Sequence, residues 1–132
     1  MKLTIIKSSR TNNFNDEHML QKISDLWKDA SDTLVKHENN IYGIYHNYES
    51  NYKGDYSLSI AIENNGEEPA IVISDSGKYE IFSVDKDDQQ GVFNTWSKIW
   101  GQEETGSLKR AYSYDFEKYY PNGDIEIYIA VK

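Results

Sequence analysis

The chain has 132 residues, of which 38% are hydrophobic and 27% are charged, a composition typical of one folded domain with a modest core. The formal net charge of −8 argues against direct binding to nucleic acid, which requires a basic surface, and favours neutral or cationic partners. The absence of cysteine excludes disulfides, a thiolate nucleophile and cysteine-based metal sites.

The N-terminal segment has only a short apolar run, interrupted by Thr4, which is too short for a signal peptide or a membrane span. We therefore expect a cytoplasmic protein with no membrane partner. His18, His37 and His46 lack the spacing of a metal site, and no phosphate-binding loop or zinc motif is present. No metal and no cofactor are expected.

The first half of the chain predicts a strand, a helix and two strands. Residues 2–10 alternate loosely, as in a strand, and Asn15 or Asp16 can cap a helix over about 16–36. The apolar residues of this helix recur at helical spacing: Leu20, Ile23, Leu26, Trp27, Ala30 and Leu34. Two strands, 41–49 and 55–63, follow around a Lys53-Gly54-Asp55 turn.

The second half repeats this order after a turn at 64–69. Strands are predicted at 70–75 and 78–85, and a helix that begins at Asp88 and stops at Gly101. The core face of that helix is predicted to contain Val92, Phe93, Trp96, Ile99 and Trp100. A polar loop over 102–107 then leads to two closing strands around Pro121-Asn-Gly-Asp.

An internal duplication is indicated by matching residues. Trp96 follows Trp27 by 69 residues, and Gly123 follows Gly54 by the same 69. We expect a single domain over 1–132 with one repeat at about 1–65 and the other at about 67–132. The predicted fold is α+β: a duplicated βαββ unit whose antiparallel sheet carries both helices on one face. A ligand groove is expected on the other face, at the pseudo-two-fold seam.

Five segments carry a resemblance to a known family: "IYGIYHNYES", "GDYSLSIAIE", "SGKYEIFSVD", "TWSKIW" and "YDFEKYYPNGDIEIYIAVK". Over nearly its whole length the chain resembles the gyrase-inhibitor-like (GyrI-like) small-molecule-binding domain, which is also the effector-binding domain of multidrug-responsive transcription regulators. The resemblance implies a pocket for aromatic, cationic compounds with a buried glutamate as counter-charge, which by motif match is Glu117. Unlike in those regulators, we expect no DNA-binding domain and no direct action on nucleic acid.

Candidate ligand-binding residues follow from strand alternation and from the resemblance. On the last strand the isoleucines are predicted to cover the helices, which places Tyr128 on the groove side. The pattern leaves open which face of 41–49 lines the groove; Gly43 and Ala61 favour the face that carries Tyr45. The full set of candidates is Glu117, Tyr45, Trp96, Tyr128, Tyr42, Tyr79 and Phe14, the last two being the weaker.

Three functions remain open at this stage. The favoured one is a stand-alone binding module for small organic cations or amphipathic compounds, acting by sequestration or by signalling to a partner protein. An alternative is a hydrolase of reactive electrophiles in which Glu117 is the general base; otherwise no catalytic residue is expected. The third is an inhibitor that binds a protein, as the gyrase-inhibitor family implies.

Overall fold

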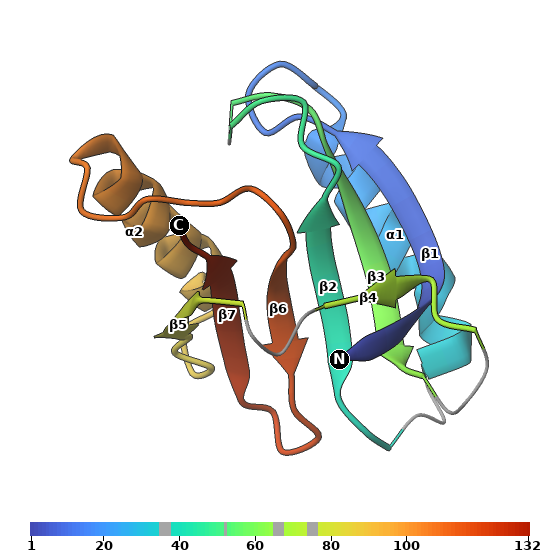
Figure 1. The fold of residues 1–132 in the computed structure, drawn as a ribbon. Coiled ribbons are helices and arrows are strands. Elements are labelled where there is room, and N and C mark those ends of the chain that lie inside the picture. Colours follow the sequence, from blue (N-terminus) through green and yellow to red (C-terminus); the bar gives the residue numbers. More distant parts are fainter. Residues whose placement is uncertain (35–37, 52, 65–67, 74–76) are drawn as a thin grey trace.

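A computed structural model describes residues 1–34, 38–51, 53–64, 68–73 and 77–132. It confirms an α+β fold with two helices and seven strands in the described part of the chain (Figure 1). The strands are β1 (Lys2–Thr11), β2 (Ile41–His46), β3 (Tyr56–Glu63), β4 (Ile71–Val72), β5 (Tyr79–Ser83), β6 (Asp115–Tyr119) and β7 (Ile125–Ala130); the helices are α1 (Met19–Leu34) and α2 (Gly91–Glu104). His37 and the expected structure at 35–36, 65–67 and 74–75 lie outside the described residues.

The strands form one curled, antiparallel sheet in the order β4-β1-β3-β2-β6-β7-β5. The order β1-β3-β2 of the first half corresponds to the order β5-β7-β6 of the second, and β2 and β6 pair in the middle (Figure 1). Gly43 lies directly opposite Glu117 in this central pair. The seam between the halves thus places residues distant in sequence side by side.

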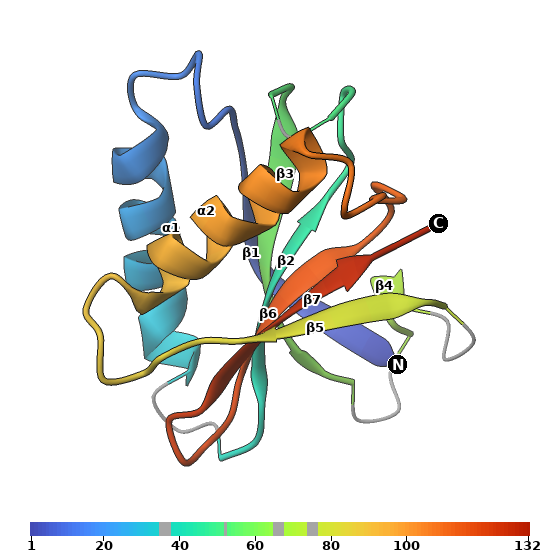
Figure 2. The same ribbon diagram turned by 90° about the vertical axis from the view of Figure 1, so that its left-hand side faces the viewer.

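Both helices cover the same face of the sheet (Figure 2). On α1, Leu26 and Ala30 form a core cluster with Tyr56, Leu58 and Ile60 of β3. On α2, Trp96 and Ile99 form the second core cluster with Ile127 and Ile129 of β7. The expectation that these isoleucines face the helices is therefore confirmed.

The opposite face of the sheet is filled by a separate cluster that contains Tyr42, Ile44 and Phe116. The rings of Phe116 and Tyr128 stack at a centroid distance of 4.6 Å, and the Tyr79 ring packs edge-on against Tyr128 and at a tilt against Phe116. The groove predicted on this face is thus occupied by the protein's own rings. The pocket that contains Glu117 lies instead on the helix face.

Helix α2 begins and ends later than predicted. The Asp88 carboxylate accepts a hydrogen bond from the Gln90 N–H, so Asp88 holds a turn and the helix starts at Gly91. Gly101 does not stop the helix, although a helical glycine costs about 1 kcal/mol relative to alanine. The helix ends instead before Gly106, whose φ of 79° is unfavourable for other residues.

The predicted strand 41–49 is shorter in the structure, because Asn47 has a φ of 53° and breaks the extended backbone after His46. Helix α1 likewise begins later than predicted, at Met19. Asp16 holds the turn before it, as Asp88 does before α2: its side chain accepts from the His18 N–H and its carbonyl from the Met19 N–H.

Candidate functional site

A cavity of about 400 Å³ opens between the two helices and the central strands. Its walls come from both halves of the chain and are mostly aromatic or aliphatic. The lining residues are Asn13, Met19, Leu20, Ile23, Trp27, Tyr45, Tyr48, Tyr56, Gln89, Val92, Phe93, Trp96, Trp100, Arg110, Glu117 and Tyr119.

Glu117 is the buried acidic group of this cavity, with an exposed fraction of 3%. Its Oε2 accepts hydrogen bonds from the Tyr45 hydroxyl at 2.8 Å and from the Trp96 indole N–H at 2.7 Å. Its Oε1 accepts from the Tyr119 hydroxyl at 2.6 Å. All three donors are neutral, and no cationic side chain of the described residues forms an ion pair with this carboxylate.

The tyrosine donors are fixed in their protonated form. Burial, followed by the nearby charge of Glu117, raises the pKa of Tyr45 well above its usual value. Burial and the same charge also raise the pKa of Tyr119 well above its usual value. At neutral pH these hydroxyls therefore act as permanent donors to the carboxylate.

Aromatic rings enclose Glu117 on several sides. The Tyr45 ring lies 4.9 Å from the Trp96 ring and 5.5 Å from the Tyr56 ring, measured between centroids. The Trp27 ring contacts Tyr119 edge-on at 5.3 Å. The box formed by Trp27, Tyr45, Tyr56, Trp96 and Tyr119 is called the aromatic box below.

Gly43 makes room for this arrangement. A Cβ atom at this position would lie 3.4 Å from both Glu117 Oε1 and Trp27 Cζ2. The absence of a side chain therefore lets the α1 indole and the β6 carboxylate approach the same point of β2.

A buried ion pair lies at another wall of the cavity. The Arg110 Nη2 donates to Asp115 Oδ2 at 2.7 Å, and Tyr48 donates to the same oxygen. Asp115 Oδ1 accepts from the Ala130 N–H at 2.8 Å. Glu103 Oε2 lies 3.6 Å from Arg110 Nη1, so two carboxylates surround this single guanidinium. Including Glu117, the charged groups here sum to a net negative charge.

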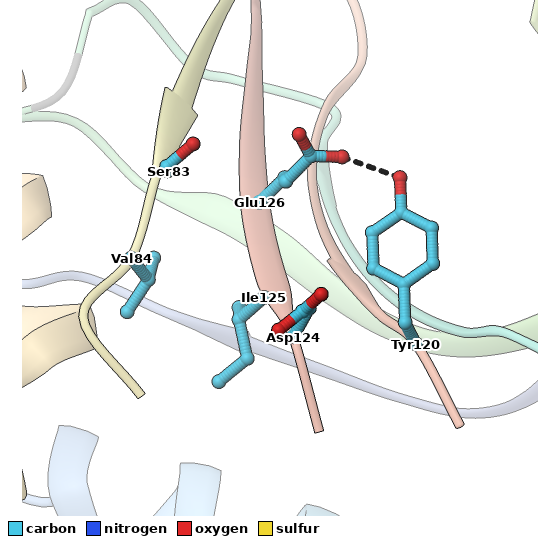
Figure 3. Close-up of a pocket in the computed structure, with 6 residues that line it drawn as sticks. All are labelled: Ser83, Val84, Tyr120, Asp124, Ile125 and Glu126. Atoms are coloured by element: carbon cyan, nitrogen blue, oxygen red, sulfur yellow. Dashed lines mark hydrogen bonds between the residues drawn. The ribbon is translucent and has the colours of Figure 1, made fainter. Parts of the chain in front are cut away.

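A second hollow, of about 440 Å³, lies between β5, β7 and the turn that precedes β7 (Figure 3). Its carboxylates already have partners: Glu126 accepts from Tyr120, and Asp124 accepts from Lys86 at 2.8 Å. It has no aromatic enclosure comparable to that of Glu117, so the first cavity is the better candidate site.

The structure brings together three of the predicted ligand residues: Glu117, Tyr45 and Trp96. Tyr42, Tyr79 and Tyr128 lie on the opposite face, in the cluster around Phe116. Phe14 does not line the cavity, but its ring lies 6.0 Å from Trp100, which does.

Three members of the aromatic box were not among the predicted ligand residues: Trp27, which was expected only on the apolar face of its helix, Tyr56 and Tyr119. Tyr119 could have been found, because it lies two residues after Glu117 on the same face of a strand. Tyr56 could not, because its place depends on the pairing of β3 with β2. Arg110 was also missed; it is one of only two arginines in the chain, which is a weak signal.

Among the described residues, no cluster of three or more histidine, aspartate or glutamate side chains could hold a metal ion. Within the same part of the chain, each helix is too short or too polar to span a membrane.

Comparison with known proteins places the chain in a family. No curated protein matches the chain. Among solved structures, an integron cassette protein from the mobile metagenome of Vibrio cholerae, VCH_CASS2, is similar with a TM-score of 0.76 and 28% identity; the match covers 100% of this chain and 90% of that one. Residues 3–131 match the family described as "Cass2: Integron-associated effector binding protein". The expected GyrI-like resemblance is therefore confirmed, and the chain belongs to the Cass2 family of integron-associated effector binding proteins.

Proposed function

We propose that this effector-binding protein takes up small aromatic or amphipathic organic cations in the cavity at Glu117, and acts by sequestration or by signalling to a partner protein. We also propose that its halves are internal repeats and that the site forms where they meet. The observation that carries the proposal is a buried carboxylate held by neutral donors inside an aromatic box.

The physical argument starts from charge. The buried carboxylate of Glu117 is stabilised by its three hydrogen bonds, but its net charge is not neutralised by any cation within ion-pair distance among the described residues. A cationic ligand supplies that charge. Ring faces add cation–π attraction of about 0.5 kcal/mol when exposed and about 2 kcal/mol or more when desolvated.

Hydrogen-bond saturation favours a particular kind of cation. A carboxylate accepts about four hydrogen bonds, and Glu117 already accepts three. A primary ammonium, which has three N–H groups to satisfy, would therefore find few acceptors here. A quaternary or ring-delocalised cation does not need several hydrogen-bond acceptors, so the occupied carboxylate does not weaken its binding. The ring faces of the aromatic box attract its positive charge.

The same hydrogen bonds favour binding over hydrolysis. A general base must offer a free lone pair to a water molecule, and three of the roughly four acceptor positions of Glu117 are already occupied by donors of the protein.

The proposal is tested with a matched pair of ligands: 1-methylquinolinium, which is cationic, and 1-methylnaphthalene, its neutral isostere. Isothermal titration should show binding of the cation that is weakened by about tenfold or more in Glu117→Gln, in line with about 1.4 kcal/mol per tenfold change. The neutral compound should bind more weakly and be insensitive to Glu117→Gln. Glu126→Gln, on the opposite face, is the control and should leave the affinity for the cation unchanged. Equal binding of the two compounds, or a cation affinity unaffected by Glu117→Gln, would contradict the proposal.

A further inference from the structure

Exposed apolar side chains gather at the mouth of the cavity. Among the described residues five large hydrophobic side chains are strongly exposed, and three of them belong to this region: Leu20 at 77%, Phe93 at 59% and Phe14 at 56%. Val72 and Ile81 are elsewhere, on β4 and β5. The rim is defined here as Phe14, Leu20, Phe93 and the partly buried Trp100.

The rim is continuous with the interior through ring contacts. Phe14 and Phe93 each contact Trp100, with centroid distances of 6.0 and 6.5 Å. Trp100 in turn lies 6.3 Å from Trp96, the indole that donates to Glu117. An apolar path therefore leads from the buried carboxylate to the surface.

The helices explain why these side chains are exposed. Leu20 lies in the first turn of α1 and Phe93 in the first turn of α2, on faces that turn toward the cavity rather than toward the sheet. The apolar periodicity of both helices includes these positions, yet the sheet clusters contain neither of them. Their apolar surface can be buried only by something that enters or covers the mouth.

Charge distribution also distinguishes the two ends of the cavity. Among the described residues, the only charged ones that line it are Glu117 and Arg110, and both are buried. At the mouth, the polar lining residues Asn13 and Gln89 are neutral. The inner end thus suits a cationic group and the rim suits an uncharged apolar one.

From this polarity we infer that the ligand is an amphiphile whose cationic head is bound at Glu117 and whose extended apolar tail lies on the rim. The inference rests on the proposed function for the head group and adds the orientation of the ligand and the surface that its tail contacts. A ligand tail is favoured over a second copy of the chain because Leu20 and Phe93 are walls of the cavity itself. A protein covering them would close the entrance.

A homologous series of N-alkylpyridinium ions, from methyl to octyl, tests this orientation below their micelle concentrations. Full burial of a methylene contributes about 0.8 kcal/mol, or about fourfold in affinity, so about two- to fourfold tighter binding per methylene is expected for the native protein. In a Leu20→Ser and Phe93→Ser double variant this dependence on chain length should fall by at least half. A Val72→Ser and Ile81→Ser double variant is the matched control, which should keep the native dependence.

Glu117→Gln separates this inference from the proposed function. Both are supported if it weakens every member of the series by a similar factor and keeps the dependence on chain length. If it has no effect, the proposed function fails. If Glu117→Gln weakens binding but the Leu20→Ser and Phe93→Ser double variant keeps the full dependence of affinity on chain length, only the placement of the tail on the rim is overturned. Sedimentation that reveals a dimer dissociated by the rim variant would also overturn it, because the rim would then be an interface between copies.

Discussion

The indole N–H of Trp96 donates a 2.7 Å hydrogen bond to Glu117 Oε2, and this bond joins α2 to the central strand β6 inside the cavity. Both groups are buried, so neither can exchange the bond for one to bulk water. The helix position and the carboxylate are therefore coupled.

Trp96→Phe keeps most of the ring but removes the donor. We expect a loss of about 1–3 kcal/mol in the free energy of unfolding, the cost of leaving a buried acceptor short of one partner, measured by urea denaturation. A double-mutant cycle with Glu117→Gln isolates the bond, because the two changes should be less than additive. Strict additivity would show that the bond contributes nothing.

Alkaline pH should destabilise the protein through its buried tyrosines. The pKa values of Tyr45 and Tyr119 are raised in the folded protein by burial and by Glu117, so their stabilising effect is complete below their unfolded pKa of about 10. It is lost progressively as the pH rises above 10. Absorbance at 295 nm should show these tyrosines ionising together with the loss of near-ultraviolet circular dichroism. Tyr45→Phe should make the free energy of unfolding fall less steeply above pH 10; an unchanged slope would contradict this.

Acid stability should depend on Asp16 at the start of α1. The hydrogen bond from Lys22, followed by the backbone N–H of His18 and the Thr11 hydroxyl, lowers the pKa of Asp16 to about 2. Because the pKa of Asp16 is depressed in the folded protein, the contribution of its ionised form to the free energy of unfolding is complete above the usual pKa of 3.8. This contribution is lost as the pH falls through 2. The difference in melting temperature between the native protein and Asp16→Asn should therefore be constant above pH 5 and shrink between pH 4 and pH 2. A constant difference down to pH 2 would be inconsistent with this role.

The buried pair Arg110–Asp115 should be sensitive to the loss of one partner. Asp115→Asn retains an oxygen to accept from the Ala130 N–H but removes the charge that faces Arg110. We expect a loss of about 3–5 kcal/mol in the free energy of unfolding, since the buried guanidinium keeps only the more distant Glu103 carboxylate, at 3.6 Å, as a counter-charge. Adding Arg110→Met should recover part of the loss. If the double variant is as unstable as the sum of the single ones, the pair has no special coupling.

The size of the side chain at position 43 should control the aromatic box. Gly43→Ala places a methyl group at ordinary contact distance, 3.4 Å, from Trp27 and Glu117, so binding of 1-methylquinolinium should change by less than about threefold. Gly43→Leu has no such space and should displace the Trp27 ring, weakening binding by about tenfold or more. Retention of native affinity by Gly43→Leu would show that ligand binding does not need this close approach.

Strand and helix periodicity was enough to predict the fold class and the partition of β7 into two faces. Ile127 and Ile129 face the helices as expected, because alternation along a strand depends only on local geometry. The position of the cavity depends on how far apart two helices lie on a curled sheet, which no local pattern records. Tyr128 was therefore placed on the correct face, but the cavity was assigned to the wrong one.

Tyr45 lines the cavity, but one of the two reasons for which the sequence favoured its face is wrong. Gly43 shares the face of Tyr45 and does open space beside Glu117. Ala61, the other small residue invoked, pairs with Tyr42 and lies on the opposite face, in the cluster around Phe116. The sequence lacks the register between β2 and β3, and register decides which small residue lies beside which ring.

The pairing of β2 with β6 divides the cavity between the halves: Tyr45 and Trp27 come from one, Glu117 and Trp96 from the other. Neither fragment of a chain cleaved between β3 and β4 would contain a complete set of binding groups. A bound cation would thus stabilise the association of the two fragments. Recovery of cation binding after the fragments are mixed would show that they have reassembled.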